Sequence, residues 1–172
     1  VRGVEVYCGA SIGIALYPAD AKVPEELIIN ADQAMYEVKK SGCNGWHFYT
    51  EEMQHKSEQR HHLYNALVTA ILDDELTFHL QPIITTHSGK TTACEALARW
   101  QRADGSWISP VEFVPIAEET GLINQVDYMI MEKAVAALQG INADRAEPIA
   151  LSVNVSPRLF QTKDQALDRW LE

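Results

Sequence analysis

The 172-residue sequence lacks any long apolar run, and no segment approaches the ~18 consecutive apolar residues of a membrane-spanning helix. No signal-peptide pattern opens the chain. Cysteine is scarce: Cys8, Cys43 and Cys94 are odd in number and lack the spacing of metal ligands. We therefore expect reduced thiols and a cytoplasmic protein, with any sensor or membrane segment lying upstream of this chain.

Positively charged residues are fewer than negatively charged ones. The chain has 14 Lys and Arg residues against 24 Asp and Glu residues, which gives a formal net charge of -10. Broad, non-specific binding of nucleic acid needs a basic surface, so this class of function is excluded. An anionic ligand would need local cations, helix N-termini or a bound metal ion. The hydrophobic content of 47% is typical of a globular protein with a buried core.

The first 50 residues have the pattern of a small α/β piece. Apolar residues alternate over 4–17, which predicts a half-buried strand. Pro24 suits the first turn of a helix, and Gly42 ends the helical pattern. A short strand follows at 46–49. One helix and one strand pair give too little core, so this piece looks incomplete, and a helix over 51–72 connects it to the rest of the chain.

The remainder alternates strands and helices. The segments LTFHLQPIIT and TTACEALARW predict a hairpin, and Ser109 and Pro110 predict the start of a helix that ends at Gly121, with Glu112 completing a capping box. Further expected elements are a helix over 124–139, a strand over 149–156 and a polar helical stretch over 162–172. This alternation predicts an α/β fold, with a parallel sheet covered by helices.

The strand TTACEALARW carries charge where a sheet core would be apolar. Glu95, Leu97 and Arg99 share one face of it, and Asn154 lies on the polar face of the later strand. Carboxylate and carboxamide oxygens suit Mg²⁺ or Mn²⁺, and an arginine can make a forked contact with phosphate. Gln81 could add a hydrogen bond. Two plainer interpretations stay open: Glu95 neutralises a nearby arginine, and Asn154 hydrogen-bonds a loop.

Other acidic residues give weaker signals. Asp127 and Glu132 occupy ordinary polar positions of a helix, and Glu118 and Glu119 fall in the last turn of one, where negative charge is mildly unfavourable. A solvated helix surface explains all four.

The motifs resemble two families of bacterial signalling domain. Residues 74–161 resemble the first part of an EAL domain, the phosphodiesterase that opens cyclic di-GMP. Residues 1–50 resemble the end of a GGDEF domain, which has the diguanylate cyclase fold. The EAL resemblance rests on LQPI (80–83), CEALARW (94–100), SPVEFVPIAEETGLI (109–123) and LSVNVSPRLF (151–160), in that order, and the GGDEF resemblance on ASIGIALYPAD and ADQAMYEVKKSGCN.

The resemblance implies three segments in an α/β chain. Residues 1–50 would be the C-terminal part of a GGDEF domain, 51–73 a linker helix, and 74–172 the first part of an EAL (β/α)₈ barrel of the TIM type. Such a barrel takes ~250 residues, so the chain is expected to be a fragment of both domains and inactive by itself.

The resemblance also implies roles for single residues. Glu95 and Asn154 match metal ligands for Mg²⁺ or Mn²⁺, and Glu95 is the catalytic candidate. Arg99 matches an arginine that meets the substrate phosphate, and Gln81 and Leu97 match positions lining the dinucleotide pocket. The implied reaction is hydrolysis of cyclic di-GMP to linear pGpG. The alternatives are a GGDEF–EAL receptor that binds cyclic di-GMP without cleaving it, and an α/β scaffold with no ligand.

The GGDEF part departs from its family. Lys39 matches a phosphate-facing lysine of cyclases, but Cys43 stands where an arginine is usual, and a thiol cannot clamp a phosphate. We therefore expect a degenerate, regulatory domain that could still hold GTP. The resemblance is also compatible with a homodimer.

Overall fold

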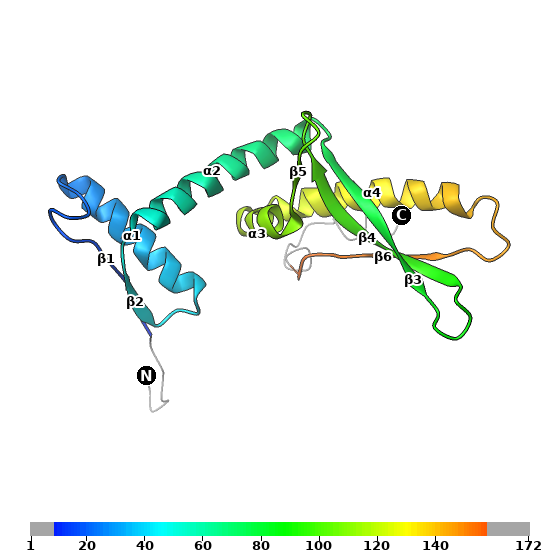
Figure 1. Ribbon diagram of the computed structural model, residues 1–172, viewed down its shortest axis with the longest axis horizontal. Helices are drawn as coiled ribbons and strands as arrows, with labels where there is room; N and C mark the ends of the chain where they lie inside the picture. The colour runs from blue at the N-terminus through cyan, green and yellow to red at the C-terminus, as the bar shows by residue number, and fades with distance from the viewer. Residues whose placement is uncertain (1–8, 158–172) are drawn as a thin grey trace, which may run out of the picture. The chain divides into compact units, whose positions relative to one another are not determined.

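The computed structural model describes residues 9–157, and the chain divides into two compact units, Val1–His62 and Leu63–Glu172. The first unit contains a helix, α1 (Pro24–Lys40), and two parallel strands, β1 (Ser11–Ile14) and β2 (Gly45–Phe48) (Figure 1). This is the strand–helix–strand piece that the sequence predicts.

Strand β1 is shorter than the alternation over 4–17 suggests. Its pairing with β2 runs from Ser11 to Ile14. Two residues later the backbone N–H of Leu16 donates to Asp20 Oδ2 at 2.6 Å, so this amide is turned to a loop and not to a neighbouring strand. Residues 4–8 of the predicted strand lie outside the described residues.

Glycine lets β1 approach α1 closely. A Cβ atom on Gly13 would lie 1.8 Å from the carbonyl oxygen of Ala31 and 2.4 Å from the backbone nitrogen of Met35. Both neighbours are backbone atoms of the helix, which a side-chain rotation cannot move away. Contact of strand and helix therefore requires glycine at this position.

A single helix, α2 (Glu51–Leu72), contributes to the cores of both units. Met53, near its start, packs with Ala34 and Tyr49 in the first unit. Leu67 and Ala70, near its end, are fully buried in the second unit. This division matches the change from a polar to an apolar half in the sequence.

The second unit is built on a mixed four-stranded sheet. Its strands are β3 (Leu76–Ile84), β4 (Thr91–Gln101), β5 (Trp107–Ile108) and β6 (Ala150–Val153). Strand β4 pairs antiparallel with β3 and β5 and parallel with β6. The predicted hairpin is confirmed. Within the described part of this second unit, the expectation of a parallel sheet holds for the β4–β6 pair alone, because a hairpin forces its two strands to be antiparallel.

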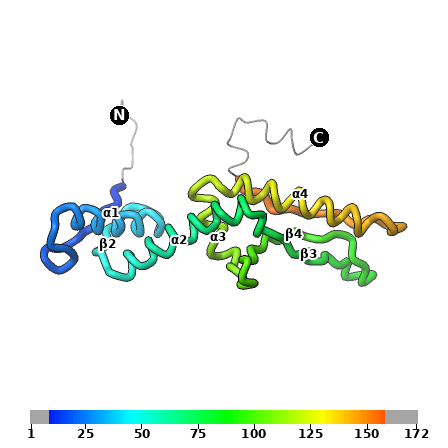
Figure 2. The backbone as a smooth tube through the Cα atoms, turned by 90° about the horizontal axis from the view of Figure 1, so that it is seen from above, coloured from blue at the N-terminus to red at the C-terminus, as the bar shows by residue number. Residues whose placement is uncertain are grey.

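Two helices cover one face of this sheet: α3 (Pro110–Thr120) and α4 (Ile123–Asn142), which runs along the strands (Figures 1 and 2). Trp100 of β4 is fully buried under them and meets Phe113 of α3 edge to face, with ring centroids 5.7 Å apart. Ala96 and Leu76 point to the same core. The apolar face of β4 therefore provides the core of this unit.

The residues at the two ends of α3 are those predicted, but Ser109 and Glu112 do not form the predicted capping box, because the Ser109 hydroxyl accepts from Val111 and the N–H of Glu112 donates to the backbone carbonyl of Ser109. Ser109 Oγ accepts a 3.4 Å hydrogen bond from the N–H of Val111, and Pro110 occupies the first helical position. Gly121 ends the helix with φ of 82°, the left-handed conformation that glycine adopts without strain. Among residues 9–157, no helix combines the length and the apolarity needed to cross a bilayer.

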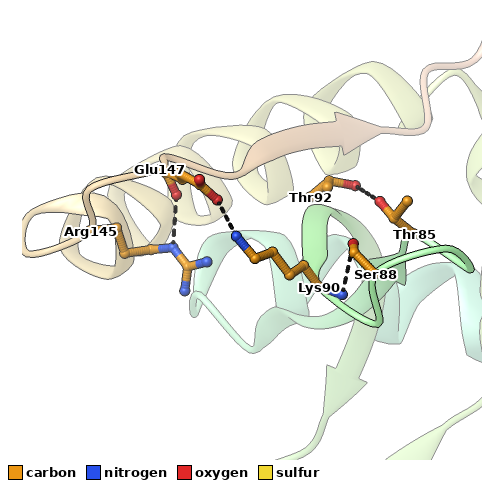
Figure 3. A network of polar contacts seen from close by, with 6 residues as sticks. All are labelled: Thr85, Ser88, Lys90, Thr92, Arg145 and Glu147. Carbon is orange, nitrogen blue, oxygen red and sulfur yellow. Dashed lines mark hydrogen bonds and ion pairs between the residues drawn. The ribbon is translucent and has the colours of Figure 1, made fainter.

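The start of β4 and the segment before β6 are joined at the surface. Lys90 Nζ lies 3.1 Å from Glu147 Oε2, and Arg145 Nε donates to the carbonyl oxygen of Glu147 at 3.2 Å (Figure 3). The side chains of Lys90 and Glu147 are 66% and 78% exposed. An ion pair so exposed contributes little to stability, about 0–1 kcal/mol.

Candidate functional site

The polar face of β4 lies opposite the helices. Because successive side chains of a strand point to opposite faces, the burial of Ala96 and Trp100 under α3 and α4 places Glu95, Leu97 and Arg99 on the other side of the sheet. The predicted assignment of faces in this strand is confirmed.

Strand β3 brings Gln81 to the same face. In the antiparallel register Gln81 is the direct partner of Glu95, and His79 is the partner of Leu97. Directly opposed residues of an antiparallel pair have their Cβ atoms about 4.5–5.5 Å apart on one face. Three of the residues predicted for the site, Gln81, Glu95 and Leu97, are therefore neighbours on two strands.

Strand β6 brings Asn154 beside Glu95. Ser152 pairs with Glu95 in the parallel register, and Asn154 follows directly after the last residue of β6. The amide Nδ2 of Asn154 donates to Oε1 of Glu95 at 2.7 Å, although the two residues are 59 positions apart in the chain. The pair that sequence reasoning proposed is thus in direct contact.

This contact is compatible with a shared divalent cation. Mg²⁺ holds oxygen ligands at roughly 2.0–2.1 Å in an octahedron, so adjacent ligands lie about 2.9 Å apart. The observed 2.7 Å between Glu95 Oε1 and Asn154 Nδ2 is close to this spacing, and rotation of the amide would turn its oxygen to the ion. The described residues contain no group of three or more His, Cys, Asp and Glu that could hold a metal. Mg²⁺ commonly binds through few protein ligands, with waters and substrate phosphates completing its shell.

Arg99 lies two residues along β4 from Leu97, on the same face. Its Nη1 donates to the carbonyl oxygen of Ala98 at 2.8 Å, and the residue is half-buried. This bond fixes one branch of the guanidinium against the strand. A guanidinium has five N–H donors in a planar fork, so the group retains further donors for an anionic ligand.

Sequence reasoning missed Asp127. This residue of α4 is half-buried, and its Oδ2 accepts a 2.9 Å hydrogen bond from the backbone N–H of Ser156. Burial raises the pKa of the Asp127 carboxyl, and the negative charge of Glu118 raises it further, while the bond from Ser156 acts in the opposite direction. The pattern of α4 offered no signal, because a polar residue beside Val126 looks like an ordinary surface position.

Asp127 and Asn154 border the same hollow. A cavity of about 300 Å³ lies between the sheet, the two helices and the segment after β6, and its lining includes Arg99, Glu118, Asp127, Asn154 and Ser156. The polar groups near the end of β6 therefore belong to one connected region.

Lys39 belongs to the other unit. It lies in the last turn of α1 and is exposed. Cys43 follows α1 with φ of 64°, and its Sγ lies 3.6 Å from the carbonyl oxygen of Lys39. The predicted phosphate contact of Lys39 stays a prediction.

Comparison with known proteins identifies both ends of the chain. The family model described as "EAL domain" matches residues 64–172, and the model described as "Diguanylate cyclase, GGDEF domain" matches residues 1–45. The mixed α/β structure is also similar to solved EAL structures, which confirms the fold that the motifs implied. The EAL enzyme Bd1971 in its cGMP-bound form matches with a TM-score of 0.60 at 20% identity, over 87% of this chain and 38% of that one.

Two curated relatives align with most of this chain. The bifunctional diguanylate cyclase/cyclic di-GMP phosphodiesterase MucR of Pseudomonas aeruginosa is 40% identical over 130 residues, which are 76% of this chain and 19% of that protein. The cyclic di-GMP phosphodiesterase PdeR of Escherichia coli is 34% identical over 164 residues, 95% of this chain and 24% of that protein. The chain thus spans a quarter or less of the length of either relative.

A solved structure of the MucR phosphodiesterase in complex with c-di-GMP is 29% identical, with a TM-score of 0.53, over 62% of this chain and 43% of that one. The family match covers more than half of the chain and includes every strand of the second unit. The chain belongs to the EAL domain family, and its N-terminal residues are the end of a GGDEF domain.

Proposed function

We propose that this chain supplies the first part of the active site of a cyclic di-GMP phosphodiesterase, which hydrolyses one phosphodiester bond to give linear pGpG. The observation that carries the proposal is the 2.7 Å contact between Glu95 and Asn154 on the polar face of the sheet. Relatives named as cyclic di-GMP phosphodiesterases support the substrate class.

Each of the candidate residues on the polar face would bind either the metal ion or the substrate. Glu95 and Asn154 hold a divalent ion, Mg²⁺ or Mn²⁺, through a carboxylate and an amide oxygen. Such an ion, when bound, would supply an activated water and stabilise the charge that develops on the phosphodiester oxygens. Arg99 binds a non-bridging phosphate oxygen with its guanidinium fork. Gln81 and Leu97 line the pocket for the dinucleotide, because they neighbour Glu95 on the same face.

Local positive charge is needed because the chain as a whole repels anions. The formal net charge of -10 works against a dianionic dinucleotide. Arg99 and a cation held by Glu95 would create an attractive site within an acidic surface, which makes binding selective for ligands that reach both groups.

The GGDEF part is proposed to regulate the barrel without cyclase activity. Cys43 stands where that family usually has arginine, and a thiol is only a weak hydrogen-bond donor without the forked N–H groups that a guanidinium offers a phosphate. Lys39 would remain as a cation for the phosphates of bound GTP. This part of the proposal predicts binding of GTP without its conversion to cyclic di-GMP.

The test uses the full-length protein with Mg²⁺ or Mn²⁺ and measures conversion of cyclic di-GMP to pGpG. We expect turnover by the wild type and a loss of more than about 100-fold in kcat for Glu95→Gln, since substitutions merely next to metal ligands already cost 10–100-fold. Glu132→Gln, at an exposed position of α4, is the matched control and should keep wild-type activity. Binding of cyclic di-GMP by the wild type with no turnover would instead establish a receptor.

A further inference from the structure

We infer that Asp127 is a positioning residue that holds Asn154 beside Glu95, and that it does so through the backbone N–H of Ser156. Asp127 would thereby fix the placement of the Asn154 side chain. The consequence of this placement for metal binding rests on the function proposed above.

The carboxylate of Asp127 projects from a helix, α4, whose neighbouring residues are packed in the core. Its neighbour Val126 is fully buried, and Ile123 and Ile130, one turn before and one turn after, belong to the same core. Because these side chains pack under the sheet, α4 cannot turn about its axis without breaking the core. Asp127 therefore presents its carboxylate at a fixed place next to the end of β6.

The segment that carries Asn154 is held at a point on either side of this residue. On one side Val153, the last residue of β6, pairs with Ala96 of β4. On the other side the N–H of Ser156 donates to Asp127 Oδ2 at 2.9 Å, and Ser156 is itself buried. Asn154 lies between these points and is exposed, so packing does not hold its side chain. Its position depends on the backbone to either side.

Removal of the carboxylate would break the hydrogen bond between Ser156 N–H and Asp127 at the second of these points. A buried N–H without an acceptor costs about 1–3 kcal/mol, and a segment next to the surface can avoid that cost by moving the amide to water. Such a movement passes through residues 154–156 and carries the Asn154 amide away from Glu95. The 2.7 Å contact between Nδ2 and Oε1 is the feature that would be lost first.

The opposite end of the same two strands offers a matched control. Glu147 precedes β6 and reaches Lys90, which precedes β4, at 3.1 Å (Figure 3). This carboxylate also joins the β4 and β6 segments, but it is exposed and lies away from Asn154. If the Asp127 variants acted only by weakening the attachment of β6 to β4, Glu147→Ala should have the same effect. If Asp127 positions Asn154, only a substitution of Asp127 should displace it.

The first experiment reads the placement of Asn154 without metal. The full-length protein is labelled with ¹⁵N-asparagine, and the Asn154 side-chain amide signal is assigned by its disappearance in Asn154→Asp. We expect Asp127→Ala to move this signal towards the position of a solvated amide and to speed exchange of its protons. Asp127→Asn keeps an oxygen that can accept from Ser156, so it should restore the wild-type signal, and Glu147→Ala should leave it unchanged.

The second experiment measures the dissociation constant for Mn²⁺ by electron paramagnetic resonance. Asp127→Ala should raise it 10–100-fold, the effect usual for residues that orient metal ligands. Asp127→Asn and Glu147→Ala should stay within about threefold of wild type. Comparison of these variants shows whether Asp127 affects the dissociation constant for Mn²⁺ by orienting Asn154 or through the negative charge of its carboxylate.

Two results would overturn the inference: an Asn154 signal that does not change in Asp127→Ala, or one that changes as much in Asp127→Asn. The proposed function fails separately. If the wild type does not bind Mn²⁺ while the Asn154 signal follows the Asp127 variants as expected, the positioning role stands and the metal site does not.

Discussion

The indole of Trp100 donates from Nε1 to Glu75 Oε2 at 3.0 Å, and the other carboxylate oxygen of Glu75 accepts from the backbone N–H of Ala103 at 3.2 Å. Glu75 precedes β3, and Ala103 lies in the turn between β4 and β5. One carboxylate thus satisfies the only polar atom of the Trp100 side chain, the largest that is fully buried among residues 9–157, and also fixes a turn.

Replacement of Glu75 by alanine should lower the free energy of unfolding by about 1–3 kcal/mol, because a fully buried indole N–H would lose its acceptor. Glu75→Gln retains one oxygen that can accept from Trp100, but its amide nitrogen cannot accept from Ala103, so it should recover only part of this loss. Urea unfolding followed by tryptophan fluorescence measures both. Equal losses in the two variants would show that the charge of Glu75, and not its hydrogen bond to Trp100, stabilises the unit.

Replacement of Gly13 by alanine should destabilise the first unit by at least about 1–3 kcal/mol, the usual cost of overpacking. The added Cβ would meet backbone atoms of α1 at 1.8 Å and 2.4 Å. Gly45→Ala is the control, since a Cβ there would meet only Val38 Cγ1 at an ordinary 3.6 Å. Hydrogen exchange of peptides from α1 and β2 should accelerate in Gly13→Ala alone, and similar exchange in both variants would contradict the close contact of β1 and α1.

Replacement of Lys133 by methionine should cost about 1–2 kcal/mol of unfolding free energy. Lys133 Nζ donates to the carbonyl oxygen of Leu76 at 2.6 Å and lies 2.7 Å from Asp74 Oδ1, with 30% of its side chain exposed. The loss leaves the carbonyl of a fully buried residue without this donor. Lys90→Met removes an exposed ion pair and should change stability by less than about 1 kcal/mol. Thermal unfolding of both variants is the measurement, and a smaller effect at Lys133 than at Lys90 would contradict it.

The stability of the protein should depend on pH through Asp127. Its pKa in the folded state is raised above the ordinary 3.8, chiefly by burial. The folded state therefore binds the proton more tightly than the unfolded state, so the group contributes stability below about pH 3.8 that is lost as the pH rises through its raised pKa. Asp127→Asn cannot ionise and lacks this decline. The difference in unfolding free energy, Asp127→Asn minus wild type, should increase across that pH range, and a flat difference would show that the pKa is not raised.

The sequence was sufficient to predict the elements whose signals are local. Alternation of side chains identified β3 and β4 and separated Glu95 from Trp100, and the Ser109 and Gly121 signals marked the ends of α3. The polar face of the candidate site followed from the same period of two. These features depend on the residues of one segment, so a single sequence contains them.

Features that depend on a distant backbone group could not be predicted. The role of Asp127 becomes visible only in the folded chain, where the buried N–H of Ser156, 29 positions away, donates to its carboxylate. Strand β1 ends early because the backbone N–H of Leu16 donates to the side chain of Asp20. The alternation of apolar residues in the sequence does not show this hydrogen bond. The contact of Asn154 with Glu95 was expected from the shared face, but its distance required the register of β4 with β6.

The alternation of β4 has a consequence for how this family can change over time. Glu95 and Trp100 stand five positions apart on one strand, one facing the candidate site and the other the core. Insertion or deletion of a single residue between them would reverse one of the two, so that either an indole would enter the face of the candidate site or a carboxylate would enter the hydrophobic interior. Length variation in homologous genes should therefore be absent from this stretch and accumulate in the loops on either side of it.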